Sequence, residues 1–414
     1  MPPTAAYIHV PFCARRCGYC NFTVAAGRDD LIDSYLAALE RELTQLSQPR
    51  PVKTLFIGGG TPTHLPPRQL WRLLAAVTNW FPLYDGSSDP SPYDGPSGPS
   101  TETLDGLESP SYKQSDGSGD PSYSGYEFSV EANPLDINAD RLAVLAEFGV
   151  NRLSLGAQSF DDRKLKFLER DHSGDDVRRA LELARPAFPS VSLDLIFGIA
   201  DETVHRWQRD LAHTCTFGLD HVSIYGLTIE RGSAFFGRLA KQEFTLPNEE
   251  TQRTMYETGI DTLTAAGFEH YEVSNFAQPG HRCRHNEVYW RCEEYYAAGP
   301  GASRYIEGRR ETNHRSTSTY IKRVQQGDSP IADAEEMDAE DRARERLVFG
   351  LRMIEGVDTK QFAAETGFSI EQLAGDTLSN LVDLGLLQRD GGALKLTRDG
   401  LLVSDSIWPE FLHR

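Results

Sequence analysis

Three cysteines stand close together near the start of the chain, in the stretch PFCARRCGYCNF at residues 11–22. Cys13, Cys17 and Cys20 are separated by three and then two residues, and no fourth cysteine follows nearby. Zinc sites use paired CxxC arms with four protein ligands, and a thiol redox pair needs only the two cysteines of one CxxC. Three thiolates and one open position instead suit a [4Fe-4S] cluster that binds an exchangeable ligand at its fourth iron. Zinc binding or purely structural thiols are the alternatives.

Glycines and polar side chains follow the predicted strands. The stretch FIGGGTPT places Gly58, Gly59, Gly60 and Thr61 directly after the second one. Residues without side chains let the backbone approach a ligand closely, although a tight turn is the alternative. The polar residues at the next strand ends are Glu131, Gln158 and Asp194, with Arg170 following twelve residues after Gln158. Each alone is usually a capping or turn residue, whereas together at one barrel edge they would line one ligand site.

The elements that must position these residues follow a repeating pattern. Six apolar, β-rich runs are each followed by a helical pattern or a long connection, namely AAYIHV, VKTLFIGGG, YEFSVEAN, VNRLSLGAQS, VSLDLIFGI and HVSIYGLT. Alternating strands and helices favour parallel pairing with the helices outside. The sequence after Tyr225 does not clearly supply the two further units of a closed barrel. We therefore predict an α/β fold in which residues 1–240 form a partial (βα)6 barrel, with its chemistry at the carboxyl ends of the strands.

Composition divides the rest of the chain. Residues 84–125 are rich in Ser, Pro, Gly and Asp and hold eight carboxylates against one lysine, so we predict a disordered, inert insert. Residues 241–335 form a connecting region. In residues 336–414, three helical patterns and a hairpin around Gly391 and Gly392 predict a winged-helix-like α+β domain. Its third helix contains no Lys or Arg, so we expect a packing or lid role and not DNA reading.

The bulk properties exclude several classes of protein. The 414 residues carry a formal net charge of -19, which argues against a nucleic-acid partner because phosphates are bound through Lys and Arg. No apolar run is long enough to span a bilayer, and the start MPPTAAYIHV lacks the layout of a secretion signal. Six cysteines in a chain of this length do not form a disulfide framework. We expect a cytoplasmic protein of two or three domains.

The CxxxCxxC arrangement and the glycine block together resemble the signature of the radical SAM superfamily. The resemblance implies that the open iron binds the amino and carboxylate groups of S-adenosylmethionine, and that the reduced cluster cleaves this cofactor to a 5'-deoxyadenosyl radical. Tyr19 matches the aromatic position beside the cluster, and the glycine motif with Gly59, Gly60 and Thr61 matches the one that holds the methionine amino group. Five further residues fall on cofactor-binding positions of the group within this superfamily that the chain resembles, as described next: Tyr7, Glu131, Gln158, Arg170 and Asp194.

Apart from the insert, the chain resembles the oxygen-independent coproporphyrinogen III oxidase group, through YIHVPFC, GGGTPT, VEANP, SLGAQSF and DLIFGI. The decarboxylating branch of that group carries a long segment before the cluster motif and a further cysteine soon after it. Here twelve residues precede Cys13, and Asn-Phe follows Cys20. The stretch RHNEVYW instead resembles the HNxxYW marker of the HemW branch, through His285, Asn286, Tyr289 and Trp290.

The HemW resemblance implies a heme chaperone that binds a [4Fe-4S] cluster, S-adenosylmethionine and heme. Its expected partners are heme and acceptor hemoproteins, with transient membrane contact only through those acceptors. Imidazole is a good axial ligand for heme iron, so His285 is the candidate heme contact, with a hydrogen-bonded core histidine as the alternative and Cys283 as a competing ligand. Retention of radical chemistry is left open, and the enzymatic alternative is oxidative decarboxylation of coproporphyrinogen III.

Overall fold

A computed structural model describes residues 2–84 and 125–412. The acidic insert predicted at 84–125 therefore lies, but for its two end residues, outside the described residues. The described chain is organised around a nine-stranded sheet with the strand order β11-β1-β4-β5-β6-β7-β8-β10-β9. No helix within residues 2–84 or 125–412 is long and apolar enough to cross a bilayer.

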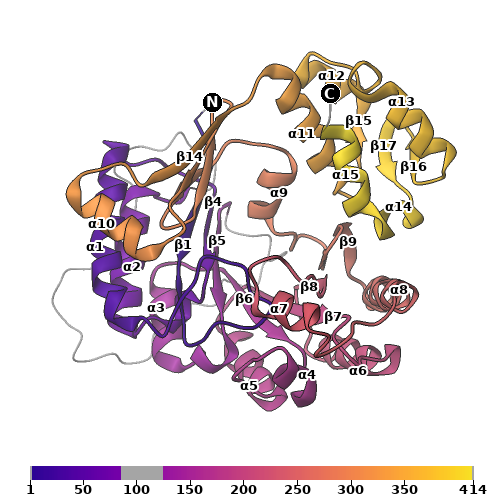
Figure 1. Cartoon of the computed structure of the whole chain (residues 1–414). Coiled ribbons are helices and arrows are strands. Elements are labelled where there is room, and N and C mark those ends of the chain that lie inside the picture. The colour runs from indigo at the N-terminus through magenta and orange to yellow at the C-terminus, as the bar shows by residue number, and fades with distance from the viewer. Residues whose placement is uncertain (1, 85–124, 413–414) are drawn as a thin grey trace, which may run out of the picture.

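Six neighbouring strands of this sheet are the predicted ones, and all of them pair in parallel. They are β1 Ala5–Val10, β4 Thr54–Gly59, β5 Glu127–Ala132, β6 Arg152–Gln158, β7 Ser190–Phe197 and β8 His221–Gly226. The helices that follow them along the chain cover the outer face of the curved sheet (Figure 1), and they are α1 Ile32–Leu43, α2 Pro67–Trp80, α3 Ala139–Glu147, α5 Gly174–Ala184, α6 Val204–Cys215 and α8 Glu249–Ala265. The predicted partial (βα)6 barrel is confirmed.

Strand β5 shows how the sequence builds the two faces of this barrel. Phe128 and Val130 are fully buried in the main apolar core, which lies between the sheet and the outer helices. Glu127, Ser129 and Glu131 alternate with them and therefore point to the concave side. Along β5 the concave side is consequently polar, and the apolar contacts of this strand are made on the outside.

Three short strands that the sequence pattern did not predict lengthen the sheet at both edges. The strands β10 Asn275–Ala277 and β9 Glu269–Glu272 add antiparallel next to β8, and β11 Tyr296–Ala298 adds parallel to β1. Between β10 and β11 the chain crosses the concave side and forms α9 Arg284–Trp290 there (Figure 1). The strands have only three or four residues each, too few for a readable alternation of apolar and polar positions.

A second, antiparallel sheet follows, formed by β12 Ser303–Ile306, β13 Arg309–Asn313 and β14 Ile331–Glu336, with α10 Thr317–Gln326 between the last two. Buried Glu42 of α1 joins this unit to the barrel, because its carboxylate accepts hydrogen bonds from Tyr320 Oη at 2.6 Å and Asn313 Nδ2 at 2.7 Å. Burial raises the pKa of Glu42, although these donors act in the opposite direction.

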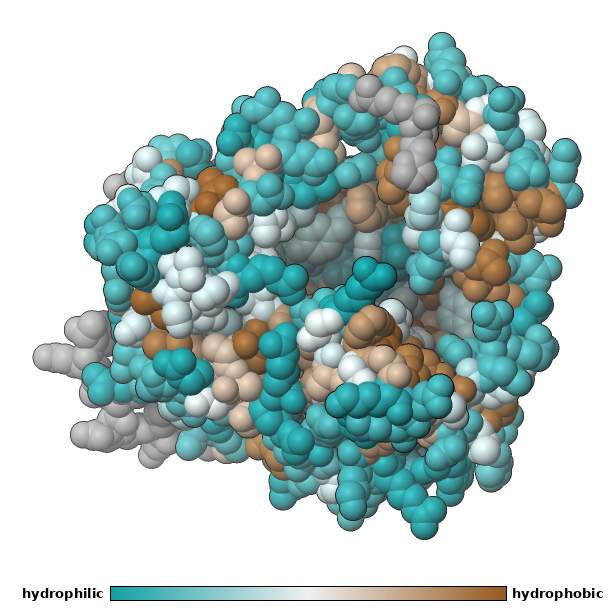
Figure 2. All heavy atoms as spheres, viewed as in Figure 1, coloured by the Kyte–Doolittle hydropathy of each residue, from teal (hydrophilic) through white to brown (hydrophobic). Residues whose placement is uncertain are grey.

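The C-terminal unit contains α11 Ala339–Leu351, α12 Thr359–Thr366 and α13 Ile370–Asp383, with a sheet of β15 Val357–Asp358, β16 Leu387–Asp390 and β17 Ala393–Leu396. The predicted three helices and the hairpin at Gly391 and Gly392 are confirmed, both glycines having positive φ. The hairpin ends at Leu396, however, and the residues after it form α14 Arg398–Leu402 and α15 Ser404–Leu412, which the sequence pattern did not predict. Figure 2 shows the face of the molecule hollowed near its centre, between these C-terminal helices and the barrel.

Candidate functional site

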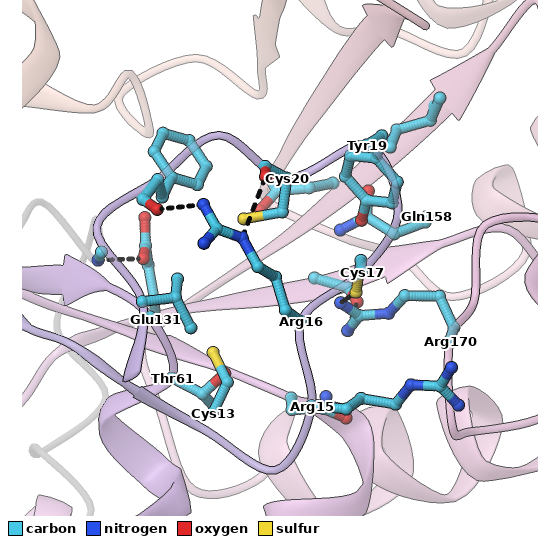
Figure 3. Close-up of a pocket in the computed structure, with 18 of the residues that line it drawn as sticks. Cys13, Arg15, Arg16, Cys17, Tyr19, Cys20, Thr61, Glu131, Gln158 and Arg170 are labelled. Atoms are coloured by element: carbon cyan, nitrogen blue, oxygen red, sulfur yellow. Dashed lines mark hydrogen bonds between the residues drawn. The ribbon is translucent and has the colours of Figure 1, made fainter. Parts of the chain in front are cut away.

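The cysteines lie on a loop that leaves the carboxyl end of β1 and is closed at its base. The two-residue strands β2 Phe12–Cys13 and β3 Ala25–Ala26 pair in parallel and hold the two ends of the loop together. Within it, the Cys20 amide donates a hydrogen bond to the Cys17 carbonyl oxygen at 3.1 Å, which makes a tight turn. The loop borders a cavity of about 660 Å³ (Figure 3).

Most of the predicted site residues line this one cavity. They are Cys13, Cys17, Tyr19, Cys20, Gly59, Gly60, Thr61, Glu131, Gln158, Arg170 and Asp194. The strand-end residues meet because parallel strands present their carboxyl ends at one edge of the barrel. Tyr7 and His285, the other two predicted residues, are not among those that line it.

The three cysteines line the cavity, and their thiols have different neighbours. Cys13 Sγ lies 3.3 Å from Thr61 Oγ1, and Cys17 Sγ accepts a hydrogen bond from Arg170 Nη1 at 3.5 Å. Among the described residues, no three His, Cys, Asp or Glu side chains form a set that could hold one metal ion. Burial raises the pKa of the Cys13 thiol to about 12, so a bound cationic centre is needed to keep it as a thiolate. This donor set fits a multi-iron cluster better than zinc.

The glycine block is shaped by crowding from two sides. Gly59 has φ 106, and a Cβ there would lie 2.2 Å from His9 Cε1, while a Cβ on Gly60 would lie 2.6 Å from the Phe12 carbonyl oxygen. The Gly59 amide donates a hydrogen bond of 2.8 Å to Glu131 Oε2 (Figure 3). Burial raises the pKa of Glu131 to about 7, against the lowering effect of this hydrogen bond. The block is therefore both a tight turn and part of the cavity wall.

Arg170 ties the cysteine loop to β6. Besides Cys17, it donates from Nη2 to the Gly156 carbonyl oxygen at 2.9 Å. Its Nε atom is buried and has no hydrogen-bond partner among the described residues. Gln158 at the end of β6 has φ 68, a left-handed conformation that non-glycine residues adopt rarely and that is a recurrent mark of ligand sites.

Asp194 of β7 completes this wall of the cavity. It accepts a hydrogen bond from Ser154 Oγ at 3.2 Å. Burial raises the pKa of its carboxyl group.

Tyr7 acts on the cysteine loop through a residue that the sequence reasoning missed. Tyr7 Oη lies 2.9 Å from His9 Nδ1, and His9 Nε2 lies 2.8 Å from the Thr23 carbonyl oxygen. Because a carbonyl oxygen only accepts, Nε2 carries the proton and Nδ1 accepts the one from Tyr7. Burial lowers the pKa of His9 to about 4, so the ring is neutral. The sequence did not indicate a role for this histidine in an apolar strand, because the groups that it contacts are known only from the fold.

The HNxxYW motif forms α9, and His285 is packed inside the concave side of the barrel. Its ring stacks on Phe56 at a centroid distance of 5.2 Å, and only 1% of the residue is exposed. Nδ1 lies 3.0 Å from Thr54 Oγ1, and Nε2 lies 2.8 Å from Tyr289 Oη. Contact of His285 with heme stays a prediction, and ligation there would require the ring to leave one of these two hydrogen bonds.

Other residues of the cavity wall carried no usable sequence signal. Arg315, from the loop before α10, donates to the Asn21 carbonyl oxygen at 2.6 Å and so reaches the cysteine loop from the second, antiparallel sheet unit. Tyr225 and Ser154 line the cavity from β8 and β6. The residues at positions 154 and 225 lie on predicted strands, but only the register places them opposite the cysteines.

The families and structures that this chain resembles are consistent with a cluster-binding site at this cavity. The chain matches the family model of the Radical SAM superfamily over residues 7–213 and that of the HemN C-terminal domain over residues 337–403. The solved structure of coproporphyrinogen III oxidase (HemN) from Escherichia coli is similar with a TM-score of 0.78 over 99% of this chain and 90% of that one, at 21% identity, which concerns the fold alone. The chain belongs to the radical SAM superfamily, and this membership implies a [4Fe-4S] cluster and S-adenosylmethionine.

Similarity to curated proteins extends over the full length. Heme chaperone HemW of Bacillus subtilis (strain 168) is 34% identical over 99% of this chain and 99% of that protein. Heme chaperone HemW of Escherichia coli (strain K12) is 31% identical over 100% and 99%. Within the superfamily, the chain belongs to the HemW family, which confirms the resemblance seen in the sequence.

Proposed function

We propose that this protein is a heme chaperone, which binds a [4Fe-4S] cluster, S-adenosylmethionine and heme and delivers the heme to acceptor hemoproteins. The observation that carries the proposal is the 34% identity to a protein named as a heme chaperone, over 99% of both chains. The likeness to HemN, at 21% identity, supports the fold and does not extend to decarboxylation.

The cluster is assigned to Cys13, Cys17 and Cys20, whose thiols line the cavity. When bound, the cluster supplies an open coordination position for the methionine tail and an electron for its sulfonium group. Arg170 lies against Cys17 and is placed to balance the negative charge of the thiolates and of the methionine carboxylate. Tyr19 covers this side of the loop, packing edge-on against Phe235 at a centroid distance of 6.4 Å.

The remaining residues of the cavity wall are assigned to S-adenosylmethionine by their chemistry. The Gly59, Gly60 and Thr61 amides are already engaged by Glu131 and by the carbonyl oxygens of Val10 and Phe12. Carbonyl oxygens of the glycine block are therefore the groups that would accept the methionine ammonium. Glu131 and Asp194 are carboxyl groups suited to accept ribose hydroxyls, and Gln158 offers an amide at the same wall.

Heme delivery, transient membrane contact through membrane-bound acceptors and a cytoplasmic location are parts of the same proposal. All six cysteines are free thiols, which suits a reducing compartment. No role in binding nucleic acid is proposed, since the net charge of -19 opposes it.

The test uses the full chain, purified and reconstituted with iron and sulfide without oxygen. We expect iron and acid-labile sulfide in the protein, a Soret band on titration with heme, and transfer of that heme to an apo-hemoprotein. A parallel incubation with S-adenosylmethionine, reductant and coproporphyrinogen III should yield no protoporphyrinogen at useful turnover. Absence of heme binding, or efficient decarboxylation, would overturn the chaperone proposal.

A further inference from the structure

Three exposed apolar residues surround the opening of the cavity. Phe22 is 66% exposed, Tyr225 42% and Leu135 41%, and all three line the cavity. They come from different walls: Phe22 from the cysteine loop, Leu135 from the turn Pro134–Asp136 after β5, and Tyr225 from the end of β8. Large exposed apolar side chains gathered at a cavity mouth are a common mark of a ligand-binding surface.

Three arginines accompany these apolar residues. Arg15, Arg16 and Arg315 line the same cavity and are exposed, and none of them forms an ion pair within residues 2–84 and 125–412. Unpaired guanidinium groups at one opening indicate an anionic ligand.

Two of these arginines flank Phe22 directly. Arg16 Nη2 donates to the Phe22 carbonyl oxygen at 3.2 Å. Arg315 donates from Nη2 to the Asn21 carbonyl oxygen at 2.6 Å and from Nε to Thr23 Oγ1 at 3.3 Å. Each guanidinium group retains further N–H donors after these contacts. The backbone segment that carries the exposed Phe22 side chain is thus held by two arginines.

Glu230 is one of the carboxylates that border this arrangement, together with Asp136 and Asp171. It also lines the cavity, but its Oε2 accepts a hydrogen bond of 2.6 Å from Asn21 Nδ2. Its charge is therefore partly satisfied by the same loop that carries Phe22.

We propose that heme binds at this cavity mouth, with its ring face on Phe22, Leu135 and Tyr225 and its propionates at Arg16 and Arg315. The inference rests on the proposed heme-chaperone function and adds a place for the cargo. A tetrapyrrole combines a flat apolar face with two carboxylates on one edge, and the mouth offers the complementary pair of surfaces.

The barrel interior at His285 is the rival location. His285 is 1% exposed and hydrogen-bonded through both ring nitrogens. A macrocycle can reach it only if α9 leaves its packing against β4, whereas the mouth accepts a ligand without such a change.

The experiment is a heme titration of cluster-loaded full-length protein, with two rim variants and one matched control. Phe22→Ser removes the exposed ring, and Arg315→Gln removes one charge. The control is Arg41→Gln, because Arg41 is likewise exposed, forms no ion pair among the described residues and donates to a backbone carbonyl oxygen, that of Gln325. Each protein is titrated with heme and with heme dimethyl ester, in which the propionates carry no charge, and its iron and sulfide content is measured.

We expect Phe22→Ser and Arg315→Gln each to weaken heme binding by about fivefold to tenfold, the range for losing one charge-assisted contact or one stacked ring. Arg41→Gln should bind heme as the wild type does. Esterification should weaken binding to the wild type but change little for Arg315→Gln, because the charge that the propionate meets is already gone.

Since Phe22 and Arg315 belong to or hold the cysteine loop, a third rim variant is placed outside that loop. Leu135→Asp lies outside that loop and places a negative charge on the rim, so it should weaken heme binding while the iron and sulfide content stays unchanged. Heme affinity unchanged in all three variants, or lost only in His285→Ala, overturns the mouth site and leaves the chaperone proposal standing. No heme binding to the wild type overturns the chaperone proposal itself.

Discussion

The backbone amide of Phe235 donates a hydrogen bond to the Gly18 carbonyl oxygen at 2.8 Å, and the Phe235 ring occupies the space beside Gly18. Phe235 belongs to α7 Ala234–Ala240 and is fully buried. Gly18 stands between Cys17 and Tyr19, so a segment distant in sequence presses on the middle of the cysteine loop. This contact fixes the loop before any ligand is bound.

Gly18→Ala is therefore expected to disturb the loop. A Cβ at this position would lie 2.1 Å from Phe235 Cε1, and Gly18 does not have a positive φ, so the effect is steric and not conformational. We expect a loss of stability of about 1–3 kcal/mol and a lower iron content after reconstitution, measured by thermal unfolding and iron analysis.

Two further variants control for this prediction. Gly237→Ala lies in the same helix α7 with open space around its Cβ, and it should leave the melting temperature unchanged or slightly higher. Gly18→Ala combined with Phe235→Leu should recover part of the loss, because the smaller side chain gives space. A Gly18→Ala single variant with wild-type stability and iron content would contradict the idea that the contact of Phe235 with Gly18 holds the cysteine loop.

Glu131 makes stability depend on pH in a defined direction. Burial raises its pKa from 4.5 to about 7, so Glu131 keeps its proton in the folded protein up to a higher pH than in the unfolded chain. The buried carboxylate therefore destabilises the folded state as the pH rises above the pKa of Glu131 in the unfolded chain. This destabilisation is complete once the pH exceeds the pKa in the folded protein. Relative to wild type, Glu131→Gln should gain on the order of 2 kcal/mol between about pH 5 and about pH 8.

Thermal or denaturant unfolding at both pH values measures this difference. Glu182→Gln, on an exposed position of α5, controls for the removal of one formal charge and should show no such gain. The same Glu131→Gln protein should bind S-adenosylmethionine more weakly, because a charged acceptor is replaced by a neutral one. An equal response of wild type and Glu131→Gln to pH would exclude the buried carboxyl group as the cause.

Arg170→Lys should distinguish the effect of the positive charge at the cysteine loop from that of the two hydrogen bonds of the guanidinium group. One ammonium group cannot reproduce the fork that reaches Cys17 Sγ and the Gly156 carbonyl oxygen together. We expect the affinity for S-adenosylmethionine to fall by at least about tenfold, measured by equilibrium dialysis on cluster-loaded protein. Arg206→Lys, at the Asp161 carboxylate outside the cavity, serves as the control and should keep wild-type affinity.

His285→Ala should lower the free energy of unfolding by about 2–4 kcal/mol, because it removes a stacked ring and leaves the Thr54 and Tyr289 hydroxyl groups without their partner. Asn286→Ala, the next residue of the motif, is the control for a change on the same helix and should cost less. Titration of both variants with heme decides the role of the motif: a Soret band of unchanged position and affinity in His285→Ala would exclude His285 as the axial ligand.

Much of the fold could be read from local patterns, and the reasons are physical. The six strands of the barrel are short apolar runs bounded by glycines or polar residues. The helices between them have one apolar face, which repeats with the period of a helix. Both patterns can be recognised in the sequence. Strands β9, β10 and β11 were missed because three or four residues carry no period, and their pairing partners lie far away in the chain. Helices α14 and α15 were missed because the segment after the hairpin was interpreted as its continuation.

The chemistry of the site could be read from the residues alone: the spacing of Cys13, Cys17 and Cys20, the glycine block, and polar residues that each follow a strand. Parallel pairing is enough to bring such strand ends to one edge. The surroundings of these residues, in contrast, follow from the packing of the whole chain. The position of His285 inside the barrel, the reach of Arg315 to the cysteine loop and the pressure of Phe235 on Gly18 all depend on contacts between distant segments, which no local pattern encodes.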